Sequence, residues 1–260
     1  MKLLKFELNK ILTQKSVYIV FIILFSLNLI KDQDFQHGPM NNIDFVSQLI
    51  TAGMILVALS TIFTREYSSG VEHYILSSNK GRKTIGWTKI GASLIFTAVV
   101  VFTWEILIVA INLFWFGNTG WGDPIQSLLT FSNSQYELSL LEYHLAQIGI
   151  HLLGAFCLAL LIVLLSSISK SSIVVFFTAA LILLGPILLD EINAPWISEV
   201  LKFSIFHVMS VETLFFELRS VQILGFSVSY PILASLLMIV LSLLFIKLIL
   251  LIVKNKEVTG

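Results

Sequence analysis

The stretch TREYSSGVEHYILSSNKGRKTIGWTK, residues 64–89, decides how this chain is organised. It is the longest polar interruption in the first half of a sequence that is otherwise mostly apolar. Four of its apolar residues recur at i, i+4, i+7 and i+8, which predicts a short helix with one apolar face; they are Tyr67, Val71, Tyr74 and Ile75. Such a face either lies on a membrane surface or enters a groove on a soluble partner, and the spacing favours neither.

The rest of the chain is too apolar for a soluble globular protein. Of its 260 residues 57% are hydrophobic and 12% are charged, and the mean hydropathy is +0.92. This composition leaves too little polar surface to cover a soluble domain, so we expect a membrane protein. The single cysteine, Cys157, excludes an intrachain disulfide.

Six apolar segments are close to the length of about 20 residues that a membrane-spanning helix needs. They are residues 16–31, 43–64, 90–115, 145–168, 171–189 and 228–253. We therefore predict an all-α polytopic membrane protein with six transmembrane helices in one domain, residues 1–260. The first segment is short, and Pro186 near the end of the fifth predicts a kink or an early stop.

Basic residues predict the orientation, because they concentrate in cytoplasmic segments. With the N-terminus inside, thirteen of the sixteen lysine and arginine residues lie on the cytoplasmic side, and the exceptions are Lys31, Lys202 and Arg219. We expect a multi-pass protein of the cell membrane with both termini cytoplasmic. An even number of spans follows from that arrangement.

Two segments are predicted to lie at the membrane surfaces. Residues 1–15 form an amphipathic helix whose lysines would lie near anionic lipid, in the interface plane. Residues 190–227 contain apolar patches, but Glu212, Glu217 and Arg219 would each be costly at mid-membrane. We therefore predict short extracellular amphipathic or re-entrant helices before the sixth span.

No sequence pattern for catalysis or cofactor binding is present. The string NKGRKT, residues 79–84, lacks the upstream glycine of a phosphate-binding loop and has arginine where lysine is required. The five histidines have no metal-ligand spacing. We predict no catalytic residues, no metal site and no cofactor bound by this chain.

Glu105 is the one acidic residue near the centre of a predicted span. An ionisable group at that depth is costly, and it either lines a pathway, relays a proton or pairs with a polar group on a neighbouring helix. His144 and His151 lie two helical turns apart on one face of the fourth span, where packing roles are commoner than ligand roles.

Residues 64–89 also carry the pattern REYxxGxxxxxLxSxxxRxxxxxxK. Its matching positions are Arg65, Glu66, Tyr67, Gly70, Leu76, Ser78, Arg82 and Lys89. Together with the basic amphipathic N-terminus and the order of spans, this pattern resembles the permease subunits of type-2 ABC transporters. The resemblance covers the whole chain in topology, and its sequence-specific part is confined to this segment and the N-terminal helix.

The resemblance implies a transport subunit that is not an enzyme. Residues 64–89 would be a cytoplasmic coupling segment that docks on a separate ATP-binding subunit, which would hold ATP and magnesium. The docking residues would be Arg65, Glu66, Tyr67, Gly70, Val71, Tyr74 and Ile75. A second permease and the lipid bilayer would be the other partners, with no nucleic acid, and compact members export antimicrobial or toxic peptides or drugs.

Two other classes of function fit the sequence. An intramembrane enzyme would use Glu105, His144 and His151 as acid, base or ligand. A stand-alone membrane immunity protein would sequester a toxin without any ATPase.

Overall fold

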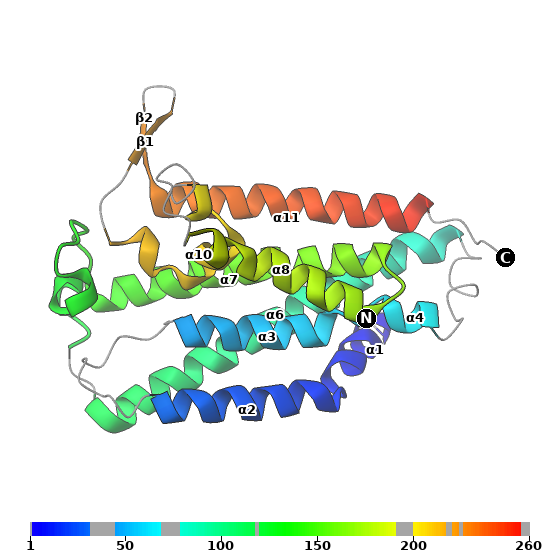
Figure 1. Cartoon of the computed structure of the whole chain (residues 1–260), viewed down its shortest axis with the longest axis horizontal. Helices are drawn as coiled ribbons and strands as arrows, with labels where there is room; N and C mark the ends of the chain where they lie inside the picture. Colours follow the sequence, from blue (N-terminus) through cyan, green and yellow to red (C-terminus); the bar gives the residue numbers. More distant parts are fainter. Residues whose placement is uncertain are drawn as a thin grey trace.

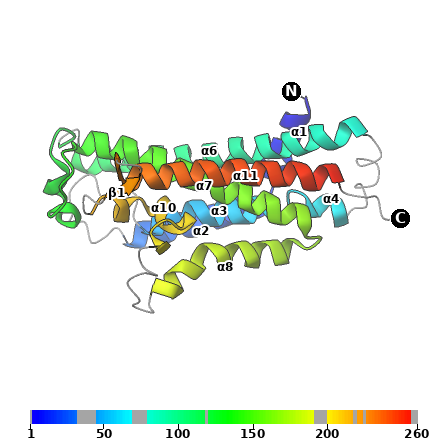
Figure 2. The ribbon, with the colours of Figure 1, turned by 90° about the horizontal axis from the view of Figure 1, so that it is seen from above.

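Long helices run side by side along the molecule (Figures 1 and 2). The structure is a computed structural model, and it describes residues 2–31, 45–68, 79–117, 120–190, 200–216, 220–223 and 226–255. The long helices are α2 (Lys15–Lys31), α3 (Phe45–Leu59), α6 (Asn79–Phe116), α7 (Leu140–Ile168), α8 (Ser172–Asp190) and α11 (Tyr230–Asn255). The shorter helices are α1 (Lys2–Leu12), α4 (Thr64–Ser68) and α10 (Ile205–Ser210).

Five described helical stretches are long and apolar enough to cross a membrane. They are Gln48–Tyr67, Lys83–Ile111, Leu140–Ile168, Ser172–Leu189 and Tyr230–Asn255. This confirms the predicted class of all-α polytopic membrane protein. The predicted first span corresponds to α2, whose 17 residues fall one short of the 18-residue length that those five reach.

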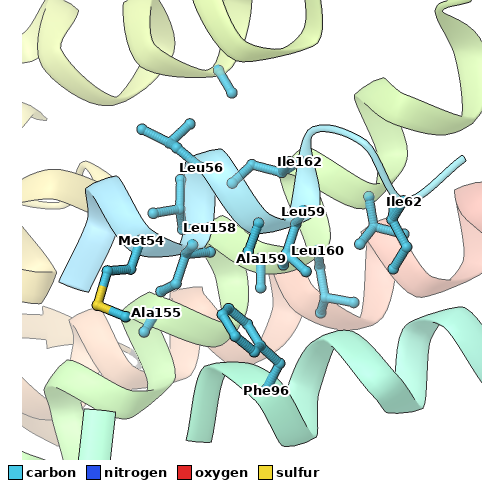
Figure 3. Close-up of a cluster of buried hydrophobic side chains, with 14 of the residues drawn as sticks. Met54, Leu56, Leu59, Ile62, Phe96, Ala155, Leu158, Ala159, Leu160 and Ile162 are labelled. Carbon is cyan, nitrogen blue, oxygen red and sulfur yellow. The ribbon is translucent and has the colours of Figure 1, made fainter. Parts of the chain in front are cut away.

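The helix α7 is the centre of the bundle. It packs against α3, α6, α8, α10 and α11. Small residues on α7, including Ala155 and Ala159, let neighbouring helices approach closely. Figure 3 shows how Leu59 of α3 and Phe96 of α6 pack with Leu158 and Ala159 in this core.

The outer surface of the bundle carries many large apolar side chains. On α8, for example, Phe177 and Leu181 are 66% and 67% exposed. Large apolar side chains this exposed are unfavourable in water but favourable against lipid chains. The surface therefore agrees with a membrane-embedded bundle.

The two ends of the bundle differ (Figure 1). We call one the α1 end, because it holds α1, α4 and the C-terminal turn of α11. We call the other the α10 end. There, the connection from α6 to α7 contains two 3-10 turns, η1 (Ile125–Ser127) and η2 (Leu129–Phe131).

The long connection before α7 is folded onto the α10 end. The ring of Tyr143 lies 4.9 Å from that of Phe131 and 5.3 Å from that of Phe215, measured between centroids. The Ser134 hydroxyl donates a hydrogen bond of 2.8 Å to the Phe215 carbonyl. These contacts join the connection to the segment that follows α10, so both form one cap.

The predicted region 190–227 differs in part from the structure. Its described part contains α10, the 3-10 turn η3 (Glu212–Leu214), and the strand β1 (Ser220–Ile223) of an antiparallel hairpin with β2 (Phe226–Ser229). The helical prediction therefore fails from residue 220 onward, where alternating Val221 and Ile223 suit a strand. Residues 191–199 lie outside the described residues.

Other predicted boundaries also shift. The sequence Asn79-Lys80-Gly81 is typical of a turn and predicts one there, but in the structure it forms the first turn of α6. The predicted second span, 43–64, continues through a turn after α3 into α4, so the stretch long enough to cross a membrane ends at Tyr67. The helix α7 begins at Leu140, five residues before the predicted span, because Ser139 and Glu142 form a capping box.

Candidate functional site

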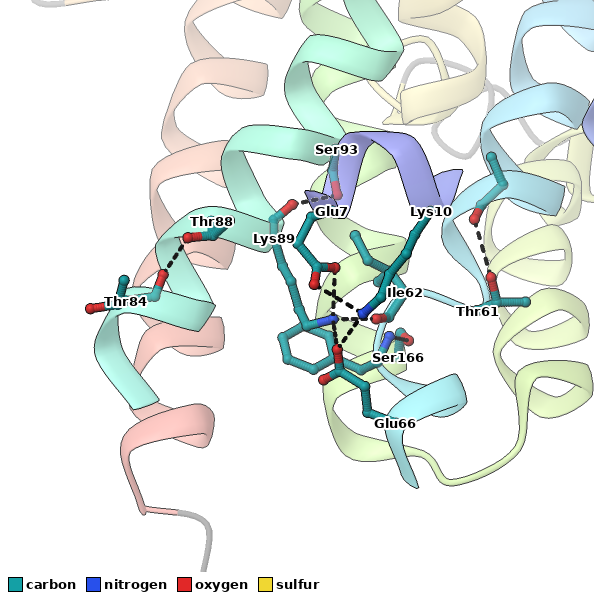
Figure 4. A network of polar contacts seen from close by, with 12 residues as sticks. Glu7, Lys10, Thr61, Ile62, Glu66, Thr84, Thr88, Lys89, Ser93 and Ser166 are labelled. Carbon is teal, nitrogen blue, oxygen red and sulfur yellow. Dashed lines mark hydrogen bonds and ion pairs between the residues drawn. The ribbon is translucent and has the colours of Figure 1, made fainter. Parts of the chain in front are cut away.

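Four charged side chains meet inside the α1 end, and we call them the ion cluster (Figure 4). They are Glu7 and Lys10 of α1, Glu66 of α4 and Lys89 of α6. The Lys89 Nζ lies 2.8 Å from Glu66 Oε1 and 3.2 Å from Glu7 Oε2. The Lys10 Nζ lies 3.0 Å from Glu7 Oε1 and 3.1 Å from Glu66 Oε1. Each lysine therefore bridges both carboxylates.

Lys89 is the buried centre of the ion cluster. It is fully buried, with 0% of its surface exposed. Its ammonium group has three hydrogens, and the third donates a 2.6 Å bond to the Ile62 carbonyl in the turn between α3 and α4. The Nζ also lies 4.8 Å from the centroid of the Phe63 ring, a favourable cation–π distance. All three donors of Lys89 are thus satisfied.

The charges of the ion cluster balance. Two carboxylates face two ammonium groups, which makes burial tolerable, since an unpaired buried charge is costly. Partial burial lowers the pKa of Lys10, but hydrogen bonds and attraction from Glu66 and Glu7 outweigh that effect. The pKa of Lys10 therefore lies above the ordinary value of 10.5.

Local structure holds α1 where the ion cluster needs it. Glu7 and Lys10 are three residues apart, so they project from the same side of the helix. Ile11 packs into the core with 2% of its surface exposed. At the bend into α2, the Gln14 amide donates a 3.2 Å hydrogen bond to the Ala58 carbonyl of α3.

The short helix α4 is also attached to α7. The Tyr67 hydroxyl donates a 3.0 Å hydrogen bond to the Ser167 carbonyl. The Phe63 amide, just before α4, donates a 3.0 Å bond to the Ser166 hydroxyl. Through these bonds and the ion cluster, α4 contacts α1, α6 and α7 at once.

The predicted docking residues divide into three groups. Glu66 and Tyr67 face inward, toward the ion cluster and α7 respectively. Arg65 is exposed. The remaining ones, Gly70, Val71, Tyr74 and Ile75, lie outside the described residues.

No hydrogen bond among the described residues joins Glu105, His144 and His151, the three residues of the enzyme hypothesis. Within the described part of the chain, neither oxygen of the buried Glu105 and neither ring nitrogen of His144 has a hydrogen-bond partner. His144 instead packs edge-on against Trp121, with 6.1 Å between centroids. His151 uses both of its nitrogens elsewhere. Among the described residues, no group of three or more possible metal ligands occurs.

His151 belongs to a second buried polar group, which we call the neutral cluster. It consists of Gln48 and Thr51 of α3 and His151 of α7, all 0% exposed. The His151 Nδ1 lies 2.7 Å from the Met209 carbonyl of α10, so this nitrogen carries a proton and donates. Its Nε2 lies 3.1 Å from the Thr51 hydroxyl.

The neutral cluster holds α10 inside the bundle. The Gln48 amide donates a hydrogen bond to the Phe206 carbonyl, also on α10. The close approach of α10 to α7 requires Gly154, because a Cβ there would lie 2.7 Å from Met209 Cγ. The Met209 carbonyl lies in the last turn of α10, where a helix supplies no donor of its own, so His151 gives this buried carbonyl its partner.

Comparison with known proteins gives one family. Residues 8–259 match the family described as "Protein of unknown function (DUF2705)". The chain belongs to this family. No curated protein matches the chain. The DUF2705 match extends from within α1 to beyond α11. It therefore includes the whole neutral cluster and every member of the ion cluster except Glu7.

The ion cluster and the neutral cluster were both missed in the sequence. A signal for the ion cluster existed, since Glu7 is the only acid among the first fifteen residues of this DUF2705 chain. A lone acid in a basic segment predicts an internal partner. For the neutral cluster, Gln48 and Thr51 lie three residues apart in an apolar span, which places both on one helix face.

Proposed function

We propose that the chain is the membrane-spanning permease subunit of an ATP-driven exporter of the type-2 ABC class. ATP and magnesium would be bound by a separate cytoplasmic subunit. The observation that carries the proposal is the 2.8 Å ion pair between Glu66 and Lys89. These residues are the second and the last matched positions of the pattern on residues 64–89. Their direct contact joins the two ends of this segment, which supports the view that the pattern marks one structural element.

The attachments of α4 suit a mechanical role. Residues 69–78 follow α4 directly and would form the docking surface for the ATP-binding subunit. A force applied there would reach α1 through Lys10, α6 through Lys89 and α7 through Tyr67. ATP-driven closure of the partner would then switch the bundle between two packings.

The arrangement of helices supports a six-span topology. A helix of 17 residues is roughly 25 Å long, and the sequence of α2 begins and ends with lysine. With α2 as a span, α1 and the end of α11 lie on one side, as Figure 1 draws them. This side would be cytoplasmic, with α10 as an extracellular re-entrant helix. A second permease would complete the substrate route for a toxic peptide or drug.

The first test is complex formation. The full chain is purified from its native membrane together with candidate ATP-binding subunits of the same cell, and complex formation is measured by size-exclusion chromatography and by ATPase activity in nanodiscs. Arg65→Glu is expected to weaken the complex roughly tenfold or more, because arginine is a frequent interface hot spot. Glu137→Lys reverses an exposed charge at the opposite α10 end, in the connection before α7, and should leave binding unchanged.

Two results would contradict the proposal. One is the absence of a complex with every ATP-binding subunit tried, combined with transport that survives deletion of residues 69–78. The other is protection against a toxin in cells that lack all such subunits, which would favour an immunity protein.

A further inference from the structure

A groove on the outside of the α1 end lies between α1 and the first turns of α6. Its volume is about 490 Å³. Its lining residues are Leu4, Lys83, Thr84, Trp87, Thr88 and Gly91. The groove is separate from the ion cluster, since Lys89 turns inward from the same turns of α6 (Figure 4).

The chemistry of the groove changes along α6. Lys83 supplies an ammonium group at one end, and Trp87 supplies an indole N–H one turn further. The Thr88 hydroxyl donates to the Thr84 carbonyl at 2.7 Å, so its oxygen is left as an acceptor. Gly91 and Leu4 form the apolar end, about 12 Å from Lys83 along the helix axis. This order, polar and then apolar, is that of a phospholipid headgroup and its acyl chains.

The groove also lies at the depth of lipid headgroups. The apolar stretch of α6 that can cross a membrane begins at Lys83. Trp87 is 48% exposed, and tryptophan collects at membrane interfaces. A molecule bound in this groove would therefore be in contact with the lipid bilayer.

Among the described residues, the exposed charges of α1 and of the first turns of α6 are positive. Lys2, Lys5 and Lys83 are exposed, and none of them pairs with an acid among the described residues. Glu7, which would offset them on α1, is turned into the ion cluster and already bound by two lysines. Basic grooves beside membrane helices select anionic headgroups.

We propose that this groove binds one anionic phospholipid, with its phosphate beside Lys83 and Trp87 and its chains along Leu4 and Gly91. The bound lipid fastens α1 to α6 from outside, as the ion cluster does from inside. This binding does not depend on the transport function proposed above.

Quenching of tryptophan fluorescence tests the site. The full chain in detergent is titrated with phosphatidylglycerol that carries brominated chains, which quench a tryptophan they touch. Trp87→Phe removes the signal of the groove and leaves that of the other tryptophans. We expect Lys83→Ala to raise the half-saturating lipid concentration about fivefold, the effect of one lysine near a charged membrane surface.

Two comparisons decide the chemistry. Lys170→Ala removes an exposed lysine outside the groove and should leave the titration unchanged. On the original chain, brominated phosphatidylcholine should bind about fivefold more weakly than brominated phosphatidylglycerol. On Lys83→Ala, the two lipids should bind with the same affinity.

Each alternative result overturns the proposal. Equal quenching by both lipids, or equal behaviour of Lys83→Ala and Lys170→Ala, would show that no anionic headgroup is recognised. Unchanged quenching in Trp87→Phe would place the lipid elsewhere. Displacement by millimolar inorganic phosphate would make the site a phosphate site instead.

Discussion

The α1 end and the α10 end are each held together by a buried polar cluster, but the two clusters use different chemistry. The ion cluster has four charges, and one of its members, Lys10, has a side chain that is 35% exposed. The neutral cluster has an amide, a hydroxyl and an imidazole, all fully buried. Charge is thus used where the cluster reaches the surface, and neutral hydrogen bonds are used where it does not.

This difference has a consequence for how each end fails. In the ion cluster, loss of one member leaves an unbalanced buried charge, so the remaining members become destabilising. In the neutral cluster, loss of one member leaves unpaired but uncharged groups, whose cost is smaller. The α1 end should therefore lose stability abruptly and the α10 end gradually.

The largest effect is expected for Lys89→Met. This change keeps the apolar stem but leaves Glu7 and Glu66 with Lys10 alone, and the cost should be about 3–5 kcal/mol. For a chain of this size the melting temperature should fall by on the order of 10 °C. Differential scanning fluorimetry of the purified full chain measures the shift.

A double variant separates charge from packing. Lys89→Met with Glu66→Gln restores the charge balance, and it should be more stable than Lys89→Met alone. Lys170→Met serves as the control for loss of an exposed lysine. If the double variant is less stable than the single one, the charge imbalance is not what destabilises the α1 end.

Replacing His151 of α7 should have an intermediate effect on stability, and replacing His144 of the same helix serves as its control. His151→Phe leaves the Met209 carbonyl and the Thr51 hydroxyl without their imidazole partner, which should cost about 1–3 kcal/mol. His144→Phe removes ring nitrogens that make no hydrogen bond of normal geometry among the described residues, and beyond a weak interaction with Gln147 little is lost, so the cost should be smaller than for His151→Phe. Hydrogen exchange of α10 should accelerate only in His151→Phe. Equal losses in both variants would mean that packing dominates.

Two glycines of α7 test the close approach of α10. Gly154→Ala places a Cβ 2.7 Å from Met209 Cγ and 3.3 Å from the Met209 amide nitrogen, and the required shift should cost about 1–2 kcal/mol. Gly149→Ala meets nothing within 4 Å and should be neutral or slightly stabilising. Thermal unfolding of the pair measures the difference, and the same melting temperature for both would show that α10 is not packed against Gly154.

Much of the bundle could be predicted because apolar length is a local property. The spans at 90–115, 145–168, 171–189 and 228–253 lie within, or differ by at most two residues from, α6, α7, α8 and α11. The ends of the helices were predicted less accurately than their existence. The capping box at Ser139 and Glu142, for example, extends α7 beyond its apolar stretch. A window of hydropathy does not detect such polar extensions.

The two clusters could not be predicted because their partners are far apart in sequence. Glu7 and Lys89 are separated by 82 positions, and Thr51 and His151 by 100. A periodic pattern identifies one helix face but not the face that it meets. The sequence did identify Glu66, His151 and Lys89 as notable residues, but gave them roles in docking, chemistry and orientation.

The smallest effect concerns pH and again separates the two ends. The pKa of Lys10 is raised in the folded chain, so its stabilising contribution is complete below 10.5 and is lost as the pH rises through the folded value. Because Lys10 is partly exposed, the contribution should stay under about 1 kcal/mol. The difference in melting temperature between the original chain and Lys10→Met should be constant from pH 7 to 10 and shrink above pH 10.5. The corresponding difference for Gly154→Ala, which involves no titrating group, should not change. A Lys10→Met difference that already shrinks between pH 7 and 9 would mean that Lys10 is not held by Glu7 and Glu66 as a charged group.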